Sequence, residues 1–454
     1  MLSEDIALQN YELKKQALIT QIKQMHSEHQ PIGLYKNTSN LFRNRSQLSK
    51  GMDVRQFNQV LAIDPVNLFV DVEGMTTYDS LVNECLKFQC LPTVVPQLKT
   101  ITVGGALTGC GIESSSFKFG LMHETVTAFE VLLADGRVVL CTAENEHKDL
   151  FFGFPNSYGT LGYALRIRIK LYPVKPFVKL VHEKHTDSEQ YFNVLNDRCL
   201  KNRATGAVAF LDGVAFAKNE LYITSAEFVD QAPYASDYTY MSIYYQSVKQ
   251  RKEDYLTTLD YIWRWDTDWF WCSKVFYAQN PFIRFFFGKK RLNSASYSRI
   301  RKYFSHNKLA QTIYNMFYKK TESVIQDVQI PIKNTVEFLD FFEKNIDIHP
   351  IWLCPTMSYN HSRRFDLYFM TPDVLYVNFG FWDFKRYHQE DGYYNRMIEK
   401  EVVRLSGVKS LYSSSYYTED EFWAIYNKDV WQLLKNRYDP DKSLRTLFEK
   451  CNEK

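Results

Sequence analysis

Glycine residues are concentrated in one stretch of the chain, residues 101–120, which reads ITVGGALTGCGIESSSFKFG. Glycine allows positive φ angles and lets a ligand approach the backbone closely, so that main-chain N–H groups can contact phosphate or carbonyl oxygens. The composition therefore suits a cradle for an anionic or flat ligand. A long surface loop has the same composition, and this stretch by itself leaves both interpretations open.

Two more segments have the composition of a ligand-binding loop. Residues 36–40, KNTSN, offer small polar groups that could wrap a pyrophosphate, and residues 159–162, GTLG, lead into a strand pattern. Three such loops at strand ends favour a ligand site over plain surface loops. None is a dinucleotide fingerprint, because Gly109-x-Gly111 is followed by Ser114 where a third glycine is needed, and no Walker A motif occurs.

Hydrophobic periodicity predicts the elements that must position these loops. Short strands alternate with few helices before residue 175, which favours an α+β domain. Thr76 and Asp79 suggest a capping box, and Asp135-Gly136 is a strong hairpin signal. We expect helices over residues 3–28 and 77–89 and strands near residues 60–62, 68–72, 91–95, 129–133, 138–140 and 165–171.

Length, charge and cysteine spacing limit the function classes. A chain of 454 residues exceeds the size of one core, so about two or three domains are expected. The net charge is +3 with interspersed signs, which argues against nucleic acid. The eight cysteines form no zinc-type spacing, so we expect no metal site and thiols in a reducing compartment. We find no signal-peptide pattern and no transmembrane segment, and expect a cytoplasmic protein.

Aromatic residues make up 16% of the chain, and they are densest in residues 261–287. Such a run suits a pocket for a large apolar molecule or a patch at a membrane interface. Ordinary core packing is the alternative. Arg284, inside the run, and residues 289–291, directly after it, are basic and favour peripheral contact with anionic lipid.

Several runs, in order along the chain, resemble the sterol Δ24-reductases (24-dehydrocholesterol reductase, Diminuto). That family belongs to the FAD-dependent oxidoreductases of the vanillyl-alcohol-oxidase (VAO) and p-cresol-methylhydroxylase (PCMH) type. The likeness spans most of residues 50–451. The runs are TVGG (102–105), GCGIESSS (109–116), LADG (133–136), GTLG (159–162), NPFIR (280–284), HPIWLCP (349–355) and EFW (421–423).

The resemblance implies a PCMH/VAO-type fold, in which two α+β subdomains bind FAD and carry an inserted α+β cap. Residues 1–176 would form the FAD-binding domain, 177–405 the cap or substrate domain, and 406–454 a segment returning to the FAD domain. FAD would be held non-covalently. Its expected contacts are Asn37, Thr38, Ser39, Asn40, Thr102, Val103, Gly104 and Gly105 at the pyrophosphate, and Gly109, Gly111, Ile112, Ser114, Ser115, Gly159, Thr160 and Gly162 near the isoalloxazine.

The resemblance also implies the reaction. NADPH would reduce FAD, and the reduced cofactor would reduce a carbon–carbon double bond of a sterol or isoprenoid-like lipid while an acid supplies a proton. Glu113, Tyr412 and Tyr416 are the candidate acids; a salt bridge of Glu113 to Lys118 is its structural alternative. The family's Tyr-Ala-Asp-Cys-Tyr run reads YSSSY here, at residues 412–416, and its His-Lys-Tyr-Gly run reads FKFG.

These substitutions keep two other functions open. One is an FAD-linked oxidase or dehydrogenase of an alcohol or sugar-lipid. The other is a catalytically altered flavin-binding or scaffold protein that kept the fold.

Overall fold

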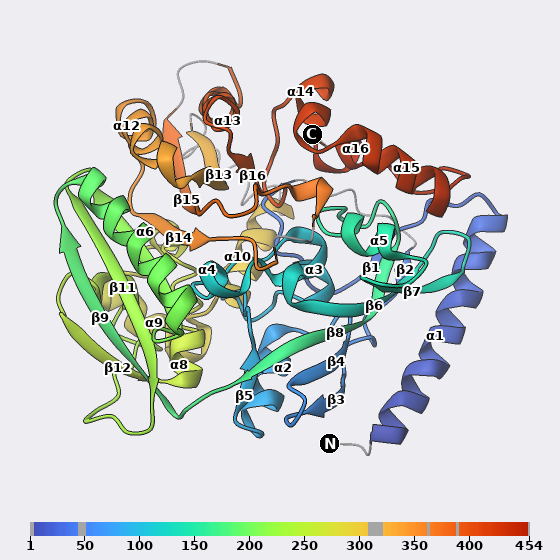
Figure 1. The fold of residues 1–454 in the computed structure, drawn as a ribbon, viewed down its shortest axis with the longest axis horizontal. Coiled ribbons are helices and arrows are strands. Elements are labelled where there is room, and N and C mark those ends of the chain that lie inside the picture. The colour runs from blue at the N-terminus through green and yellow to red at the C-terminus, as the bar shows by residue number, and fades with distance from the viewer. Residues whose placement is uncertain (1–3, 44–50, 307–320, 361–363, 387–389, 453–454) are drawn as a thin grey trace.

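Two antiparallel sheets organise the protein, and one chain segment joins them (Figure 1). The computed structural model describes residues 4–43, 51–306, 321–360, 364–386 and 390–452. Strand β8 (Tyr163–Pro173) of the first sheet continues into β9 (Phe177–His185) of the second. Because both sheets are antiparallel and are combined with helices, the fold belongs to the α+β class, and that prediction is confirmed.

The six-stranded sheet has the order β3-β4-β8-β6-β7, and β5 pairs with β8. Side chains along β8 alternate between buried and half-buried positions, as its period-2 pattern predicts. The hairpin at Asp135-Gly136 is present, and Gly136 has a φ of 87°. The elements of this part are β3 (Val60–Asp64), β4 (Phe69–Glu73), α2 (Tyr78–Leu86), β5 (Cys90–Pro92), α3 (Val103–Gly109), α4 (Ser116–Phe119), η1 (Met122–Thr125), β6 (Val126–Leu132), β7 (Val138–Thr142) and α5 (Lys148–Gly153).

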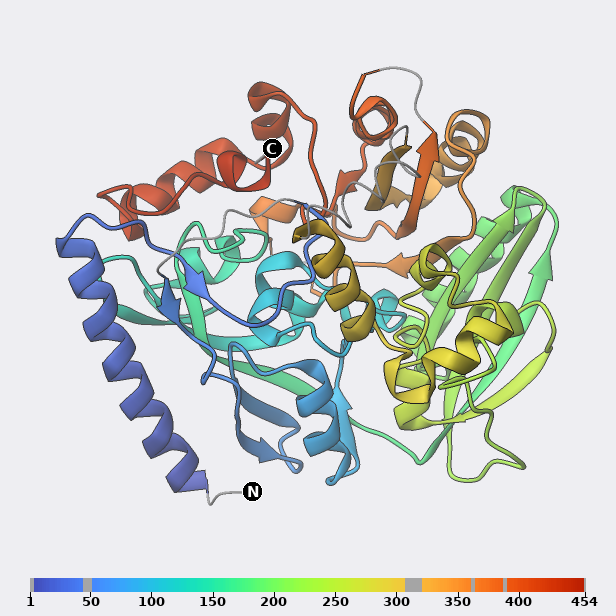
Figure 2. The same cartoon turned by 180° about the vertical axis from the view of Figure 1, so that it is seen from behind.

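The N-terminal helix α1 (Glu4–Ser27) runs along the outside of this sheet (Figures 1 and 2). Its apolar stripe, which includes Tyr11 and Ile22, is buried against the sheet, and the Tyr11 hydroxyl donates a 2.9 Å hydrogen bond to Glu130. The amphipathic helix expected over residues 3–28 is thus present. A two-stranded parallel pair follows it, β1 (Leu34–Tyr35) and β2 (Met52–Asp53).

The eight-stranded sheet has the order β12-β9-β11-β10-β14-β15-β13-β16. Its two faces belong to different cores: Leu353 and Phe379 pack with the covering helices, whereas Trp352 and Trp382 belong to the core shared with the first sheet. The elements are α6 (Ser188–Thr205), β10 (Phe210–Ala217), β11 (Glu220–Val229), β12 (Glu253–Thr257), β13 (Thr321–Pro331), η4 (Ile332–Asn334), α12 (Thr335–Asn345), β14 (Ile351–Thr356), η5 (Asp366–Tyr368), β15 (Tyr376–Arg386), α13 (Tyr393–Arg404) and β16 (Val408–Lys409).

The aromatic run 261–287 divides into a buried and an exposed half. Trp265 and Trp271 are almost fully buried, and Phe270 stacks on Trp382 with ring centroids 4.4 Å apart. Only the later part of the run reaches the surface. The elements in and around it are α7 (Tyr244–Ser247), α8 (Thr258–Ile262), η2 (Cys272–Phe276), α9 (Pro281–Phe287), η3 (Lys289–Arg291) and α10 (Ser294–His306).

The C-terminal segment returns to the first sheet. The Trp431 indole donates to the Thr160 hydroxyl at 3.2 Å, and the Lys435 ammonium donates to the Thr160 carbonyl at 3.0 Å. These contacts hold the C-terminal segment against residues 159–162. The helices are α14 (Glu419–Ile425), α15 (Lys428–Tyr438) and α16 (Leu447–Cys451).

Two local expectations are wrong. The glycine-rich stretch contains a helix, α3, because Thr102 caps it and Gly104 packs closely on Gly74. Helix α2 is capped by Thr77, whose side chain accepts from the Ser80 N–H at 3.3 Å. Thr76 does not cap it, since its hydroxyl donates to the Gln59 carbonyl instead.

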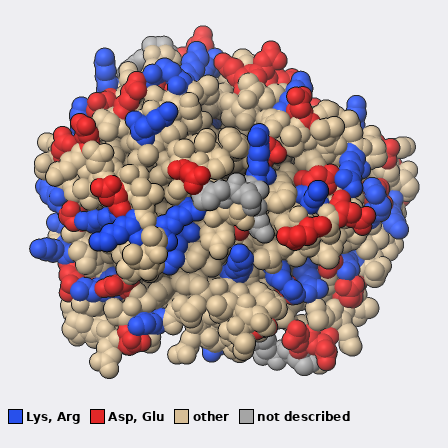
Figure 3. All heavy atoms as spheres, viewed as in Figure 1, with Lys and Arg blue, Asp and Glu red and all other residues tan. Residues whose placement is uncertain are grey.

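Surface charges of both signs are interspersed on the face that Figure 3 shows. Among the described residues, no helix combines the length and apolarity that crossing a bilayer requires.

Candidate functional site

A cavity of about 390 Å³ lies where the two sheets meet, and segments from both line it. The N-terminal loop, α3, the start of β8, the aromatic run and the eight-stranded sheet all contribute. The predicted residues that line it are Thr38, Ser39, Asn40, Thr102, Gly104, Gly105, Gly109, Gly111, Ile112, Gly159, Gly162 and Tyr412. The predicted residues outside the lining are Asn37, Val103, Glu113, Ser114, Ser115, Thr160 and Tyr416.

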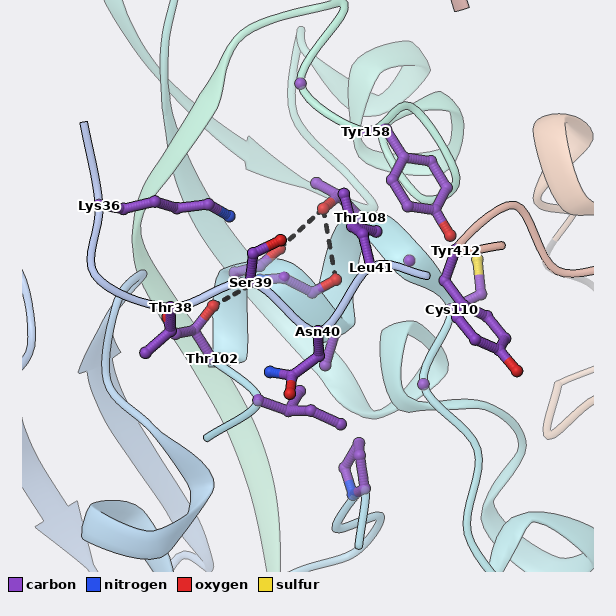
Figure 4. Close-up of a pocket in the computed structure, with 18 of the residues that line it drawn as sticks. Lys36, Thr38, Ser39, Asn40, Leu41, Thr102, Thr108, Cys110, Tyr158 and Tyr412 are labelled. Atoms are coloured by element: carbon purple, nitrogen blue, oxygen red, sulfur yellow. Dashed lines mark hydrogen bonds between the residues drawn. The ribbon is translucent and has the colours of Figure 1, made fainter. Parts of the chain in front are cut away.

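The loop of residues 38–41 passes across α3 at one end of the cavity (Figure 4). Asn40 accepts a 3.1 Å hydrogen bond from the Thr100 hydroxyl, and the Phe42 N–H donates to the Tyr412 carbonyl at 2.9 Å. These bonds tie the loop to the segment before α3 and to the C-terminal segment. The Lys36 side chain extends along this loop toward Ser39.

Helix α3 presents glycine to the cavity, although its first N–H groups are already bonded. The N–H groups of Val103 and Gly104 donate to backbone carbonyls, and that of Gly105 donates to the Thr102 hydroxyl at 3.2 Å. A Cβ added at Gly105 would come near only that hydroxyl, and one at Gly109 only the Tyr158 ring. What these glycines provide is space for close approach, not free donors.

Four other predicted contacts lie behind the cavity wall. The Ser115 hydroxyl donates to the Thr93 carbonyl at 2.7 Å, the Ser114 hydroxyl donates to Glu113, and the Thr160 hydroxyl donates to the Ser157 carbonyl at 2.8 Å. Val103 is buried in the core. These side chains hold the backbone of the glycine loops in place and do not face the cavity.

Unpaired polar atoms in the lining point to a ligand in the cavity. Both amide atoms of Gln97, the Tyr158 hydroxyl and Nη2 of Arg43 are buried, and none has a hydrogen-bond partner among the described residues. All three residues line the cavity. The Arg43 guanidinium also lies over the Tyr158 ring, 5.1 Å from its centroid. Because a buried unpaired polar group is costly, a ligand that bonds these atoms would stabilise the site.

Another part of the cavity lining is aromatic and carries one buried carboxyl. Trp269, Phe270, Trp352 and Trp382 line this wall, together with Asp327 and Tyr412. The carboxylate of Asp327 accepts from the Asn378 amide at 2.5 Å. Burial raises the pKa of Asp327 to about 6, although hydrogen bonds from Asn378 and the Tyr412 hydroxyl oppose the rise. Burial and the Asp327 charge raise the pKa of Tyr412 well above its usual value.

Glu113 lies away from the cavity in a buried ion cluster. Nη2 of Arg264 lies 3.1 Å from Asp212 Oδ2 and 3.5 Å from Glu113 Oε1. Burial raises the pKa of the Glu113 carboxyl, and Arg264 and the Ser114 hydroxyl oppose the rise. The ion partner of Glu113 is Arg264, not Lys118, because Arg264 is buried beside it.

Tyr416 also lies outside the cavity. Its ring packs against Gly392, and its N–H donates to the Glu399 carboxylate at 3.1 Å. Of the three candidate acids, the structure brings only Tyr412 to the cavity.

Arg43, Gln97, Tyr158 and Asp327 line the cavity and were not predicted. For Asp327 there was a signal, because a carboxylate within the apolar pattern VIQDVQIP is costly unless it has a role. No spacing in the sequence distinguishes Arg43 or Gln97 from other polar loop residues.

The residues present fit FAD. The polar loop and the glycines of α3 leave room for a close-lying diphosphate. The unpaired amide, hydroxyl and guanidinium groups offer hydrogen bonds to a polar ring system. The aromatic wall beyond them suits an apolar molecule held against a flat ring.

Comparison with known proteins agrees with this geometry. Residues 14–142 match the family model described as an FAD binding domain. The Delta(24)-sterol reductase of Homo sapiens is 27% identical over 409 residues, which cover 86% of this chain and 75% of that protein. The Delta(24)-sterol reductase of Rattus norvegicus is 28% identical over 412 residues, covering 86% and 75%. That of Pisum sativum is 25% identical over 450 residues, covering 88% and 76%.

The resemblance expected from the motifs is thereby confirmed, as are the PCMH-type FAD-binding fold and FAD as the cofactor. The protein is an FAD-dependent oxidoreductase.

Proposed function

We propose that this protein is an FAD-dependent reductase that uses NADPH to reduce a carbon–carbon double bond of a sterol or isoprenoid-like lipid. The proposal rests on the similarity to Delta(24)-sterol reductases over most of the chain. The single structural observation that carries it is the cavity, whose lining combines glycine-rich segments, aromatic rings and one buried acid.

The chain divides, in this proposal, into an FAD-binding domain of residues 1–176, a cap of 177–405 and a returning segment of 406–454. Thr38, Ser39, Asn40 and Gly105 would border the diphosphate, and Gln97, Gly109 and Tyr158 the ring system. Their place in the cavity wall supports this assignment. Asn37, Ser114, Ser115 and Thr160 would support these loops from behind.

Proton delivery falls to Tyr412 and Asp327. Bound FAD supplies hydride transfer, and saturating a double bond needs one hydride on one carbon and one proton on the other. Tyr412 lines the cavity beside Asp327. When Asp327 is protonated, its carboxyl can donate to the Tyr412 oxygen, so that Tyr412 gives its own proton to the substrate carbon and receives the Asp327 proton in its place. A carboxyl with a pKa near 6 is partly protonated close to neutral pH, which suits this exchange.

The substrate is expected to be apolar. Trp269, Phe270, Trp352 and Trp382 offer a ring surface that suits an apolar skeleton, and they exclude water from the reacting carbons. Among the described residues that line this wall, Asp327 is the only carboxyl group. A polar alcohol or sugar would find few partners there.

We also propose that the protein works in the cytoplasm and touches membranes peripherally through part of residues 261–287. Exposed rings late in that run support the contact.

Spectroscopy of the purified protein tests the function. Protein isolated without added cofactor should be yellow, and anaerobic NADPH should bleach the flavin absorbance. Adding desmosterol, a sterol with a Δ24 double bond, should then restore the colour and yield the saturated sterol.

Other outcomes would identify the alternatives. Bleaching by an alcohol and not by NADPH would replace the reductase with an alcohol oxidase or dehydrogenase. Colourless protein that takes up no FAD would leave a scaffold role.

A further inference from the structure

Helix α9 has its polarity reversed relative to an ordinary surface helix. Its charged residue, Arg284, is fully buried, whereas Phe282, Phe285 and Phe286 are 72%, 61% and 65% exposed. A surface helix normally buries its apolar side chains and exposes its charged ones. Neighbouring exposed phenylalanines on one short helix therefore call for something that covers them.

Arg284 anchors the helix rigidly. Its guanidinium makes two hydrogen bonds to the Asp268 carboxylate, at 2.6 and 3.0 Å, and one to the Ala278 carbonyl at 3.2 Å. At the N-terminus, Asn280 accepts from the Phe282 and Ile283 N–H groups. The exposed rings are thus held outward by a built framework and do not belong to a loose tail.

Basic residues follow the aromatic ones directly. Lys289, Lys290 and Arg291 form the exposed turn η3, and only Lys289 has an acidic partner among the described residues, Asp237 at 3.3 Å. Tyr277, before the helix, is 67% exposed. This segment, yellow in Figure 2, lies on the side of the molecule that faces away from the viewer in Figure 1.

We propose that α9 and η3 dock the protein on an anionic membrane surface, with Phe282, Phe285 and Phe286 entering the interface and Lys290 and Arg291 facing lipid headgroups. Apolar insertion combined with basic attraction is the pair of signals that interfacial binding uses. A second copy of the chain fits less well. A twofold interface would bring the basic turns of both copies together, and a single short helix offers less than the roughly 800 Å² per partner that a stable dimer buries.

The docking helix is linked to the cavity wall through adjacent residues. Asp268, which holds Arg284, immediately precedes Trp269, which lines the cavity. An inserted α9 would hold this wall near the bilayer, from which an apolar substrate could reach the site. Docking specifies the residues and the lipid charge of the membrane contact proposed above, and it does not depend on the proposed reaction. The access of substrate to the site does rest on that reaction.

Vesicle sedimentation with the full-length, FAD-loaded protein tests the docking. We expect co-sedimentation with phosphatidylcholine vesicles containing 30% phosphatidylserine, and little with phosphatidylcholine alone. F282S/F285S/F286S should lose at least tenfold in binding. K290E/R291E should bind anionic vesicles much more weakly, and the binding that remains should depend little on salt.

A matched control carries three exposed apolar substitutions elsewhere, L13S/V66S/L433S, at side chains that are 71%, 87% and 70% exposed. It should bind as the unsubstituted protein does. Thermal unfolding and the flavin spectrum of every variant should match those of the unsubstituted protein, because none of these side chains is buried.

Failure of the unsubstituted protein to bind anionic vesicles would overturn the proposal, and so would full binding by the triple phenylalanine variant. If the unsubstituted protein instead forms a dimer without lipid while the triple phenylalanine variant stays monomeric, that result would assign the exposed face of α9 to a second copy of the chain. Vesicle binding needs no turnover. Vesicle binding without desmosterol reduction would therefore support docking and reject the proposed reaction. Desmosterol reduction without vesicle binding would support the reaction and reject docking.

Discussion

The indole Nε1 of Trp382 donates a 2.9 Å hydrogen bond to the hydroxyl oxygen of Tyr412. Burial raises the pKa of the same hydroxyl, and the Asp327 carboxyl raises it further through its charge and a hydrogen bond. Trp382 comes from β15 and Asp327 from β13, and both line the cavity with Tyr412. The pair of strands thus orients a proton donor at the aromatic wall.

Tyr412→Phe should slow double-bond reduction by about 100-fold or more, the usual effect of losing a general acid. The change removes only the hydroxyl, so flavin binding and bleaching by NADPH should persist. Stopped-flow absorbance of reoxidation by desmosterol measures the effect. Tyr416→Phe, outside the cavity, is the control and should react normally. Equal rates for the two variants would rule out Tyr412 as the donor.

Asp327→Asn should remove a pH-dependent loss of stability. The folded pKa of Asp327, about 6, exceeds its usual value of 3.8, so the folded state binds more protons between these values. Stability from this group is full below about pH 4 and falls by up to about 3 kcal/mol as pH rises through 6. The free energy of unfolding is measured for both proteins at pH 4 to 8. The difference between them at each pH gives the pH dependence of stability that Asp327 contributes. A flat difference would contradict the raised pKa.

Gly105→Val should yield folded, colourless protein. The added side chain would enter the cavity next to the Thr102 hydroxyl, where a diphosphate needs close approach. Thr108→Val is the control on the same helix. It introduces valine into α3 without adding side-chain volume, because threonine and valine are similar in size. We expect that control to be yellow. Retained flavin in folded Gly105→Val, judged by its visible spectrum, would show that the cofactor lies elsewhere.

Arg264→Met should destabilise the fold by about 3–5 kcal/mol, because it leaves the buried carboxyls of Glu113 and Asp212 without a cation. Arg404→Met, at an exposed ion pair, is the matched control and should change little. Chemical denaturation measures both.

Glu113→Gln should alter stability and leave the rate of double-bond reduction nearly unchanged, because Glu113 does not line the cavity. A large loss of rate with normal flavin content would instead place Glu113 in the reaction. The same reoxidation assay used for Tyr412→Phe measures it.

Local sequence patterns were enough to predict most elements of the FAD-binding part. Period-2 alternation predicted β8, Asp135-Gly136 predicted the β6–β7 hairpin, and helical spacing predicted α1. These features depend on neighbours in the chain, which a sequence displays directly. The helix α3 was missed, since its glycines are poor helix formers in isolation and their packing on Gly74 comes from another segment.

By itself, the sequence determined the resemblance to sterol reductases and predicted a glycine-rich segment for the cofactor, because short motifs record the close backbone approach that a cofactor requires. Only the tertiary structure decided which side chains face the cavity. Arg43, Gln97, Asp327 and Tyr412 are far apart in sequence and meet only when the two sheets pack together. In the structure Glu113 is buried and Phe282 is exposed. Periodicity predicts which residues share one face of a helix or strand, but it does not predict what packs against that face.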